Sequence, residues 1–365
     1  MLWMVVRGDS ADMDTNELKS TEGRTWDVVV VGGGVAGLSA ALLLTRVRRS
    51  VLVIDAGEPR NAPAARVGAH NILGREGISP LELLRIGREE AASYGGEVVS
   101  GRVERVERGG STFTITTQDG RRVRARRVLV TTGLIDELPD IPGLAERWGH
   151  DVIHCVYCHG WEARDTKVGV LGNFHQALLF RQMTDRVTLF AHHAPGELTD
   201  EQWEQLAALG IEVVHGAVTA LEADTEQDKL TGARLASGTV IPLDTLVVAP
   251  TFTARGGFLE DLGLTLNPHP AVPGVQVAVG PSGFTGVQGV WAAGNVSDVL
   301  AAVPQSAGAG NTAGGAINMD LILEDARRAA EAREAASATP FDGTMEAEVS
   351  RRVLGSRAHG LEGPA

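Results

Sequence analysis

The clearest hydrophobic pattern of the chain is an unbroken apolar run over residues 28–31, which leads directly into the glycine-rich segment 32–37. Residues 38–47 then read as a helix, and a second apolar run over residues 51–54 ends in Asp55. Continuous apolar runs are typical of strands that are buried on both faces of a parallel sheet. The pattern therefore predicts the strand–helix–strand unit of nucleotide-binding proteins.

A second pattern of the same kind begins about 140 residues later, as in an internal repeat. Residues 167–171 are predicted to form a strand, residues 177–183 a helix and residues 186–190 another strand. Further predicted elements are a helix at 80–94, short strands within 97–130, a buried strand at 245–250 and a small-residue helix at 308–323. The sequence thus predicts an α/β protein with two related nucleotide-binding domains.

The glycine-rich segment has the spacing of a dinucleotide-binding loop. In such a loop Gly32 makes the tight turn, Gly34 lets the backbone approach a pyrophosphate and Gly37 allows close packing of the helix. The helix N-terminus offers amide hydrogens and a positive dipole end to the phosphates, and Asp55 is placed to accept ribose hydroxyls. The nucleotide-binding residues predicted from this unit are Gly32, Gly34, Val35, Ala36, Gly37 and Asp55.

Three further segments are candidates for cofactor contact. An apolar run at 128–130 enters the turn Thr131-Thr132-Gly133, which suits a close backbone crossing near a cofactor. Arg60 is expected to contact phosphate or adenine, with a plain surface arginine as an equal alternative. Gln305 lies at the N-terminal end of the small-residue helix, whose positive dipole end is expected to face an anionic ring.

Composition and net charge indicate which classes of binding partner are unfavourable. The 365 residues are 43% hydrophobic, enough to bury a large core, and the net charge of -13 argues against nucleic acid and anionic membrane surfaces. No apolar run reaches the length of a membrane span, so we expect a cytoplasmic protein. An arginine cluster follows an Asp119-Gly120 turn and is expected to lie on a solvated hairpin. Its members are Arg121, Arg122, Arg124, Arg126 and Arg127.

The only cysteines of the chain, Cys155 and Cys158, are separated by two residues. This spacing lets the sulfurs meet across a single turn, so the pair is predicted to cycle between dithiol and disulfide. A structural disulfide would close too short a loop to add much stability, and a zinc ribbon would need a second pair. His154 and His159 flank the cysteines, but six consecutive residues do not easily surround a tetrahedral metal ion. We predict a redox pair and no metal.

The second strand–helix–strand unit has lost most glycines of its loop. In segment 172–177 only Gly172 remains, and Phe174 stands where a glycine would admit a pyrophosphate. Segment 191–195 lacks the arginines that usually bind a 2'-phosphate. We therefore expect this unit to keep its fold and to bind no nucleotide.

Taken in order, the motifs resemble those of the low-molecular-weight, FAD-dependent thioredoxin reductases over residues 25–327. The resemblance rests on the 32–37 loop with Asp55, the 131–133 turn, the Cys155/Cys158 pair and the segment Trp291-Ala292-Ala293-Gly294-Asn295. It implies two Rossmann-like (FAD/NAD(P)-binding) domains, with the second inserted in the first. The implied parts are a disordered extension at 1–24, an FAD-binding domain at 25–137 and 266–327, an NAD(P)-binding-like domain carrying the cysteines at 138–265, and a C-terminal tail at 328–365.

By this resemblance the first domain binds the ADP half of FAD. Gly294 and Asn295 are implied to lie at the ribityl chain of the flavin, with Asn295 in the place of a family acid. Cys158 is implied to lie against the flavin, and Cys155 to react with the external thiol. Members of the family pair as homodimers, so a homodimer is expected.

Two departures narrow the resemblance. Thioredoxin reductases have an acid after the second cysteine and an intact second loop for NADPH, whereas this chain has His159 and the reduced loop at Gly172. The segment from Cys155 to Glu162 is similar to the branch that includes the gliotoxin, holomycin and romidepsin dithiol oxidases. This similarity implies an enzyme that closes a disulfide in a small-molecule dithiol and passes the electrons to O2, giving hydrogen peroxide.

The expected catalytic residues are Cys155, Cys158 and His159. Cys155 forms a mixed disulfide with the substrate, and Cys158 passes two electrons to the flavin. His159 accepts the substrate proton because its ordinary pKa lies near neutrality, and His154 is the second candidate for this base. Two other functions stay open: a reductase of thioredoxin-like proteins supplied by NADPH or ferredoxin, and a flavin-binding regulator without turnover.

Overall fold

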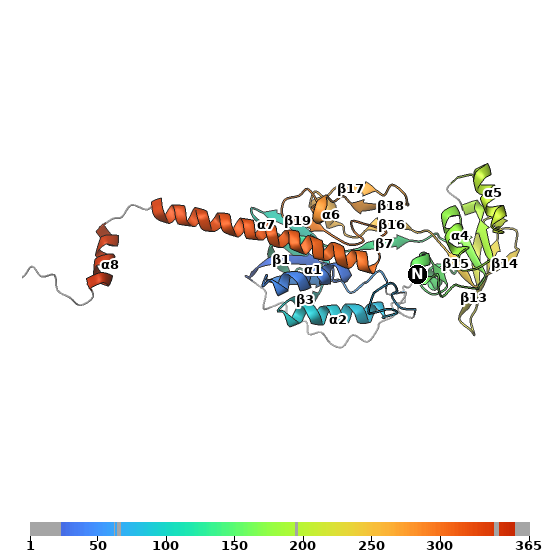
Figure 1. The fold of residues 1–365 in the computed structure, drawn as a ribbon, viewed down its shortest axis with the longest axis horizontal. Coiled ribbons are helices and arrows are strands. Elements are labelled where there is room, and N and C mark those ends of the chain that lie inside the picture. Colours follow the sequence, from blue (N-terminus) through green and yellow to red (C-terminus); the bar gives the residue numbers. More distant parts are fainter. Residues whose placement is uncertain (1–22, 62, 64–66, 194–195, 339–342, 355–365) are drawn as a thin grey trace, which may run out of the picture. The chain divides into compact units, whose positions relative to one another are not determined.

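The computed structural model describes residues 23–61, 63, 67–193, 196–338 and 343–354, and Figure 1 shows their elements in chain order. The disordered extension expected at 1–24 lies outside these residues except for Gly23 and Arg24. Among the described helices, none combines the length and apolar content needed to cross a bilayer.

The first predicted unit forms the centre of a mixed sheet made of β1 (Thr25–Val31), β2 (Val51–Asp55), β3 (Glu97–Ser100), β4 (Val103–Gly109), β5 (Thr112–Thr117), β6 (Arg122–Val130) and β19 (Val290–Ala292). The order is β3-β2-β1-β6-β5-β4, and β19 lies beside β6. β1 pairs in parallel with β2 and β6, whereas β5 pairs antiparallel with β4 and β6. The carboxyl ends of β1, β2 and β6 therefore meet at one edge, where the glycine loop, Asp55 and the 131–133 turn follow.

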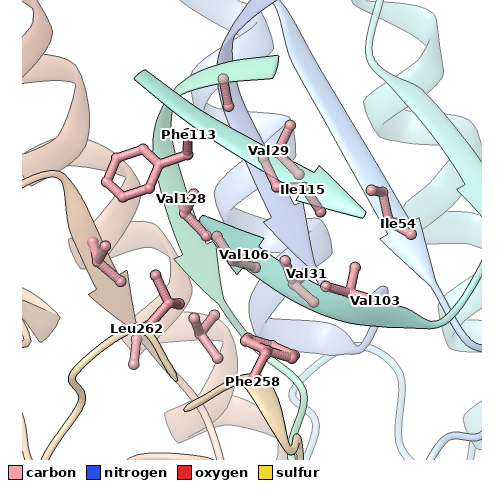
Figure 2. Close-up of a cluster of buried hydrophobic side chains, with 14 of the residues drawn as sticks. Val29, Val31, Ile54, Val103, Val106, Phe113, Ile115, Val128, Phe258 and Leu262 are labelled. Carbon is pink, nitrogen blue, oxygen red and sulfur yellow. The ribbon is translucent and has the colours of Figure 1, made fainter. Parts of the chain in front are cut away.

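Burial explains why β1 is an unbroken apolar run. Val28, Val29 and Val30 are fully buried, because both faces of the strand are covered. Figure 2 shows one of these faces, where Val29 and Val31 join side chains of β4, β5 and β6 in a single cluster. The helices α1 (Val35–Arg46) and α2 (Pro80–Ser93) pack on each other where Gly87 faces Leu38. The predicted strand, helix and strand are confirmed.

A smaller sheet joins chain segments that are far apart in sequence. It runs β17 (Leu266–Pro268), β18 (Gly274–Val277), β16 (Thr251–Ala254) and β7 (Leu134–Glu137). Directly after β16, the short helix α6 (Phe258–Asp261) places Phe258 and Leu262 in the first hydrophobic cluster (Figure 2). The chain thus returns to the first core soon after residue 250, earlier than the boundary at 265 that we predicted. The division into domains stays a prediction.

The second predicted unit forms a parallel sheet in the order β11 (Glu212–Val214), β10 (Val187–Phe190), β9 (Val168–Leu171), β15 (Thr245–Val247) and β8 (Val152–Ile153). Along it lie α3 (Val156–His159), α4 (Phe174–Phe180) and α5 (Asp200–Ala208), together with the antiparallel strands β12 (Val218–Asp224), β13 (Lys229–Leu235) and β14 (Val240–Pro242). Successive side chains of β9 alternate between two cores, with Val170 in one and Leu171 in the other. The predicted α/β fold class is confirmed.

The arginine cluster does not lie wholly in solvent. The hairpin predicted at Asp119-Gly120 is present as β5 and β6, and Arg122 and Arg124 are exposed on it. Arg126 instead pairs with Asp27 at 3.0 Å, and Arg127 is only 6% exposed. The prediction was wrong for these two arginines because β6 continues from the hairpin into the core, which a local turn signal does not reveal.

The C-terminal helix is longer than the expected segment 308–323. It is α7 (Val303–Ala338), and a further helix, α8 (Gly343–Leu354), follows. Residues 324–335 are rich in Ala, Glu and Arg, which favour helices, and Arg328 forms an ion pair with Glu324 one turn away. Part of the expected tail at 328–365 is therefore helical, because helix propensity continues after the apolar residues end.

Candidate active site

The glycine loop after β1 has a closed side and an open side. A Cβ on Gly32 would lie 2.4 Å from the Thr131 carbonyl oxygen, and one on Gly37 would lie 2.1 Å from the Gly32 carbonyl oxygen. Gly32 also has a φ of 110°, which favours glycine. A Cβ on Gly34, by contrast, would meet nothing within 4 Å. The loop thus packs tightly on one side and leaves room for a ligand at Gly34.

The N-terminus of α1 faces this open side. Gly34 is the N-cap residue and has no side chain, so no side-chain group satisfies the free amides of the first turn. Val35, Ala36 and Gly37 provide these amides, as the sequence predicted. The arrangement fits a pyrophosphate, whose oxygens accept hydrogen bonds from such amides.

Segments from the other end of the chain close around the same helix. A Cβ on Gly294 would lie 2.8 Å from the Ala36 Cβ, and one on Gly310 would lie 2.0 Å from the Ala36 carbonyl oxygen. The end of β19 and the start of α7 therefore approach the glycine loop directly. Gln305 is exposed near this N-terminal end of α7, in the position that we predicted for a flavin contact.

The 131–133 turn contributes a polar atom without a partner. The Thr131 hydroxyl donates to the Gly32 carbonyl oxygen at 2.8 Å, which ties the turn to the glycine loop. The Thr132 hydroxyl is buried and has no hydrogen-bond partner among the described residues. Gly133 follows with a φ of 71° and open space around its Cα. A buried, unsatisfied hydroxyl beside the loop is expected where a cofactor supplies the missing partner.

Asp55 lies at the end of β2, as predicted, and is held by groups from two directions. The Gly33 amide donates to Asp55 Oδ1 at 3.2 Å, and the Arg88 guanidinium of α2 forms an ion pair with Oδ2. Sequence reasoning missed Arg88, since no local motif connects a mid-helix arginine with an acid 33 residues earlier. The pair fixes the carboxylate beside the glycine loop, where a ribose is expected.

Asn295 shows why this chain has an amide where the family has an acid. Its Nδ2 donates to the carbonyl oxygens of Ala301 at 2.8 Å and Asp298 at 3.1 Å. These bonds close the loop between β19 and α7, and they leave Oδ1 as an acceptor for a hydroxyl. An aspartate here would face both carbonyl oxygens without a hydrogen to donate.

The structure places Arg60 away from the glycine loop. Its guanidinium forms a two-point ion pair with Asp136 of β7, with Nε–Oδ2 at 2.9 Å and Nη2–Oδ1 at 2.7 Å. It also lies over the ring of Phe252 at 5.2 Å. The charge of Arg60 lowers the pKa of both cysteines, so it acts at the redox pair. The contact with phosphate or adenine, which we held equal to a plain surface position, stays a prediction.

The cysteine pair lies at the start of the one-turn helix α3. Cys155 is the N-cap residue, and its carbonyl oxygen accepts from the amides of Cys158 at 3.2 Å and His159 at 3.0 Å. Both cysteines are free thiols and are partly buried. This turn brings the two sulfurs together, as the spacing predicted.

The two thiols differ in acidity. The Cys158 thiol donates to the Cys155 sulfur, and this bond is the main reason that the pKa of Cys155 falls to about 7. The amides of Cys158 and Tyr157 and the Arg60 charge act in the same direction. The same coupling raises the pKa of Cys158. Near neutral pH Cys155 is therefore the thiol that ionises first, while Cys158 keeps its proton.

The two flanking histidines have different surroundings. His154 Nδ1 lies 2.9 Å from the Val248 carbonyl oxygen, and Gln176 donates to the His154 carbonyl oxygen at 2.8 Å. His159 Nε2 is buried and has no partner among the described residues. Burial lowers the pKa of both imidazoles, which keeps them neutral at pH 7. His159 is the better candidate for a base, because no hydrogen bond from a described residue engages its Nε2, whereas His154 is held through Nδ1 by Val248.

The second glycine loop is closed by its own side chains. Gly172 keeps a φ of 69°, but the Asn173 side chain accepts from the Gln176 amide at 3.0 Å and so caps α4. Phe174 packs against the adjoining hydrophobic core. The Asn173 side chain therefore takes one amide of the first turn of α4 that a pyrophosphate would otherwise use, and the absence of a nucleotide stays a prediction.

Removing Arg60 is expected to make Cys155 less acidic. Arg60→Gln takes away a positive charge that stabilises the thiolate, and it leaves the Asp136 carboxylate unpaired, which acts in the same direction. The pH midpoint for alkylation of the reduced protein by iodoacetamide, about 7 in the wild type, should rise by about half a unit or more. Arg234→Gln, which breaks an ion pair between Arg234 on β13 and Glu222 on β12, is the control and should leave the midpoint unchanged. An unshifted midpoint in Arg60→Gln would contradict this role.

Comparison with known proteins agrees with a nucleotide-binding loop and a redox-active cysteine pair. The pattern of the pyridine nucleotide-disulphide oxidoreductase family matches residues 26–314. Thioredoxin reductase tcpT of Claviceps purpurea is 30% identical over 327 residues, covering 82% of this chain and 95% of that protein. Thioredoxin reductase sirT of Leptosphaeria maculans is 30% identical over 322 residues, with the same coverage. The crystal structure of HlmI has 43% sequence identity and a TM-score of 0.80, covering 87% of this chain and 99% of that one.

These matches agree with the site. The glycine loop fits a dinucleotide, and the buried Thr132 hydroxyl beside it has no hydrogen bond to a described residue. A thiol pair with one acidic cysteine lies at the helix α3. The predicted resemblance, enzyme class and FAD cofactor are confirmed. The chain belongs to the pyridine nucleotide-disulphide oxidoreductase family and is a thioredoxin reductase-like, FAD-dependent thiol:disulfide oxidoreductase.

Proposed function

We propose that the protein is a dithiol oxidase that closes a disulfide in a small-molecule substrate and passes the electrons to O2. The proposed catalytic residues are Cys155, Cys158 and His159. The observation that carries this proposal is the contrast between an open first loop at Gly34 and a second loop closed by Asn173. An enzyme that receives its electrons from a dithiol needs no nicotinamide site.

In the first half of the reaction, a substrate thiolate attacks Cys155 of the oxidised pair. The bond between the two cysteine sulfurs breaks, a bond between substrate and Cys155 forms, and Cys158 leaves as a thiolate. His159 takes the proton of the attacking thiol, because its neutral imidazole lies next to Cys158 in sequence and has a free nitrogen.

In the second half, the other substrate thiolate attacks the substrate sulfur of the mixed disulfide. The product leaves with its own disulfide, and Cys155 is released as a thiolate. The lowered pKa of Cys155 favours this step, since a more acidic thiol leaves faster. FAD, held by the glycine loop and Asp55, supplies the redox chemistry that moves the two electrons of the cysteine pair to O2, giving hydrogen peroxide.

The surroundings of the pair suit a small substrate. Tyr157 is 73% exposed and Trp161 is 65% exposed, so two aromatic side chains flank the cysteines at the surface. Aromatic surfaces of this kind bind the apolar body of a small molecule while its thiols reach Cys155.

A second candidate function is a reductase that runs the electrons in the opposite direction. The names of tcpT and sirT, both called thioredoxin reductases, favour it. The Asn173 cap of α4 counts against NADPH as the donor, which leaves a protein donor such as ferredoxin. A regulator without turnover is disfavoured by the acidic Cys155, because a purely structural pair does not need a reactive thiol. The expected homodimer stays a prediction.

Anaerobic reduction of the flavin separates these functions. Under argon, dithiothreitol should bleach the flavin band near about 450 nm, and NADPH at micromolar levels should not. Admitting air should restore the band and release one peroxide per flavin. Bleaching by NADPH, or reduction by dithiol that air does not reverse, would contradict the oxidase.

A further inference from the structure

The segment between β2 and α2 forms a small, internally bonded loop beside the cysteine pair. Its ends are joined by the Ala69 amide, which donates to the Ile78 carbonyl oxygen at 2.8 Å. Within it, the Glu76 carboxylate accepts from the Asn71 amide at 2.8 Å and lies 2.8 Å from His70 Nδ1. One carboxylate thus fixes both the turn and the imidazole. We call residues 69–78 the His70 loop.

The His70 loop contacts the helix that carries the cysteines. Asn71 Nδ2 donates to the Tyr157 carbonyl oxygen, between Cys155 and Cys158, at 2.6 Å. His70 Nε2 lies 3.7 Å from Oε1 of Glu162, three residues after His159. The loop therefore touches both sides of the redox turn, although about 85 residues of chain separate them.

Two buried imidazole nitrogens lie in this contact without partners. Among the described residues, neither His70 Nε2 nor His159 Nε2 has a hydrogen bond. Because His70 Nδ1 faces the Glu76 carboxylate, it carries a hydrogen, and Nε2 is left facing Glu162. His70 is therefore oriented to exchange a proton with Glu162.

The charges of this group act on one another. Glu162 raises the pKa of His159 and His70 lowers it, while burial lowers it most. The hydrogen bond from His70 lowers the pKa of Glu76, so this carboxylate stays ionised. Glu76 is 65% exposed and Glu162 is 37% exposed, so the group leads from the buried His159 to solvent.

We propose that His70, held by Glu76 and facing Glu162, is a proton-carrying residue that connects His159 with solvent during thiol–disulfide exchange. This inference rests on the proposed function. It adds a role for a loop of the nucleotide-binding half of the chain in the chemistry of the cysteines.

Proton balance shows why such a path is needed. Two substrate thiols lose two protons and two electrons, and O2 gains both pairs to become hydrogen peroxide. His159 holds one proton at a time, so it must release the first before the second thiol reacts. Glu162 and His70 receive that proton and pass it to water beside the exposed, ionised Glu76. The distance of 3.7 Å between His70 and Glu162 closes with a modest side-chain rotation.

The test compares two variants with opposite expected shifts. His70→Asn keeps an amide near the Nδ1 position for Glu76 but removes the titrating ring, whereas Glu162→Gln removes the carboxylate. The rate of flavin reduction by dithiothreitol is measured against pH under argon by stopped-flow absorbance. The pH at which the rate falls to half on the acid side of this profile should rise by about half a unit in His70→Asn. It should fall by about as much in Glu162→Gln. The ionisation of dithiothreitol affects the wild type and all variants equally, so it does not contribute to the differences between their pH profiles.

Buffer rescue gives the second readout. The plateau rate of His70→Asn should fall several-fold and recover when imidazole is added, since a small base replaces the lost carrier. His192→Asn, an exposed histidine elsewhere on the surface, is the control and should match the wild type throughout. FAD content and thermal unfolding of each variant show that the fold is kept.

The possible outcomes separate the two proposals. Opposite pH shifts together with imidazole rescue support the relay. If dithiothreitol reduces the wild type but the variants share its pH profile, or lose rate without shift or rescue, the relay is wrong and the oxidase stands. If dithiothreitol does not reduce the wild-type flavin at any pH, both proposals are wrong.

Discussion

Replacing Cys155 with serine is expected to lower turnover with dithiols by about a thousandfold or more while FAD stays bound. A serine hydroxyl cannot form the mixed disulfide, and it is far less acidic than a thiol whose pKa is about 7. FAD binding should persist because the glycine loop, Asp55 and Thr132 are unchanged. The measurements are oxygen consumption with dithiothreitol and the flavin content of the purified variant.

Cys158→Ser provides the matched comparison, because it removes the other sulfur from the same turn. It should also lose turnover, but its Cys155 should form a stable mixed disulfide with an aromatic disulfide reagent. In Cys155→Ser the contribution of Cys155 to the raised pKa of Cys158 is lost, but burial still raises that pKa, so the remaining thiol should react more slowly at pH 7. Retained activity in Cys155→Ser, or equal labelling of the two variants, would show that the cysteines do not have the proposed roles.

The sequence predicted those features of the site that depend on residues close together in the chain. The turn at Gly32, the amides of α1 and the redox turn at Cys155 each depend on fewer than ten consecutive residues. Local geometry fixes such sites, so spacing alone predicts them. The second loop is also a local feature, and the structure adds that Asn173 caps α4 there, while the loss of a nucleotide stays a prediction.

The sequence did not predict contacts between side chains that are far apart in the chain. Arg60 meets an acid 76 residues away, and Arg88 meets one 33 residues away. Nothing near an arginine in sequence tells which distant strand or helix will face it. The His70 loop was missed for the same reason, since its partner Glu162 lies in the turn after α3, about 90 residues further along the chain.

Two substitutions in the glycine loop are expected to separate FAD binding from folding. In Gly34→Ala the added methyl group meets no protein atom within 4 Å, and the backbone φ of -75° suits alanine. The fold should therefore be kept, while the methyl group occupies the space needed by the pyrophosphate. We expect FAD affinity to fall by about a hundredfold, equivalent to about 2.7 kcal/mol.

In Gly37→Ala the methyl group would instead lie 2.1 Å from the Gly32 carbonyl oxygen and 2.6 Å from the Thr131 hydroxyl. The Gly32 carbonyl oxygen belongs to the backbone and cannot move without displacing the end of β1, so the apoprotein itself should lose about 1–3 kcal/mol of unfolding free energy. Thermal unfolding must be compared in the apoproteins, because bound FAD stabilises the folded state by mass action. A Gly34→Ala variant that binds FAD as tightly as the wild type would place the pyrophosphate elsewhere. A Gly37→Ala apoprotein as stable as the wild type would contradict the close packing of α1 on the loop.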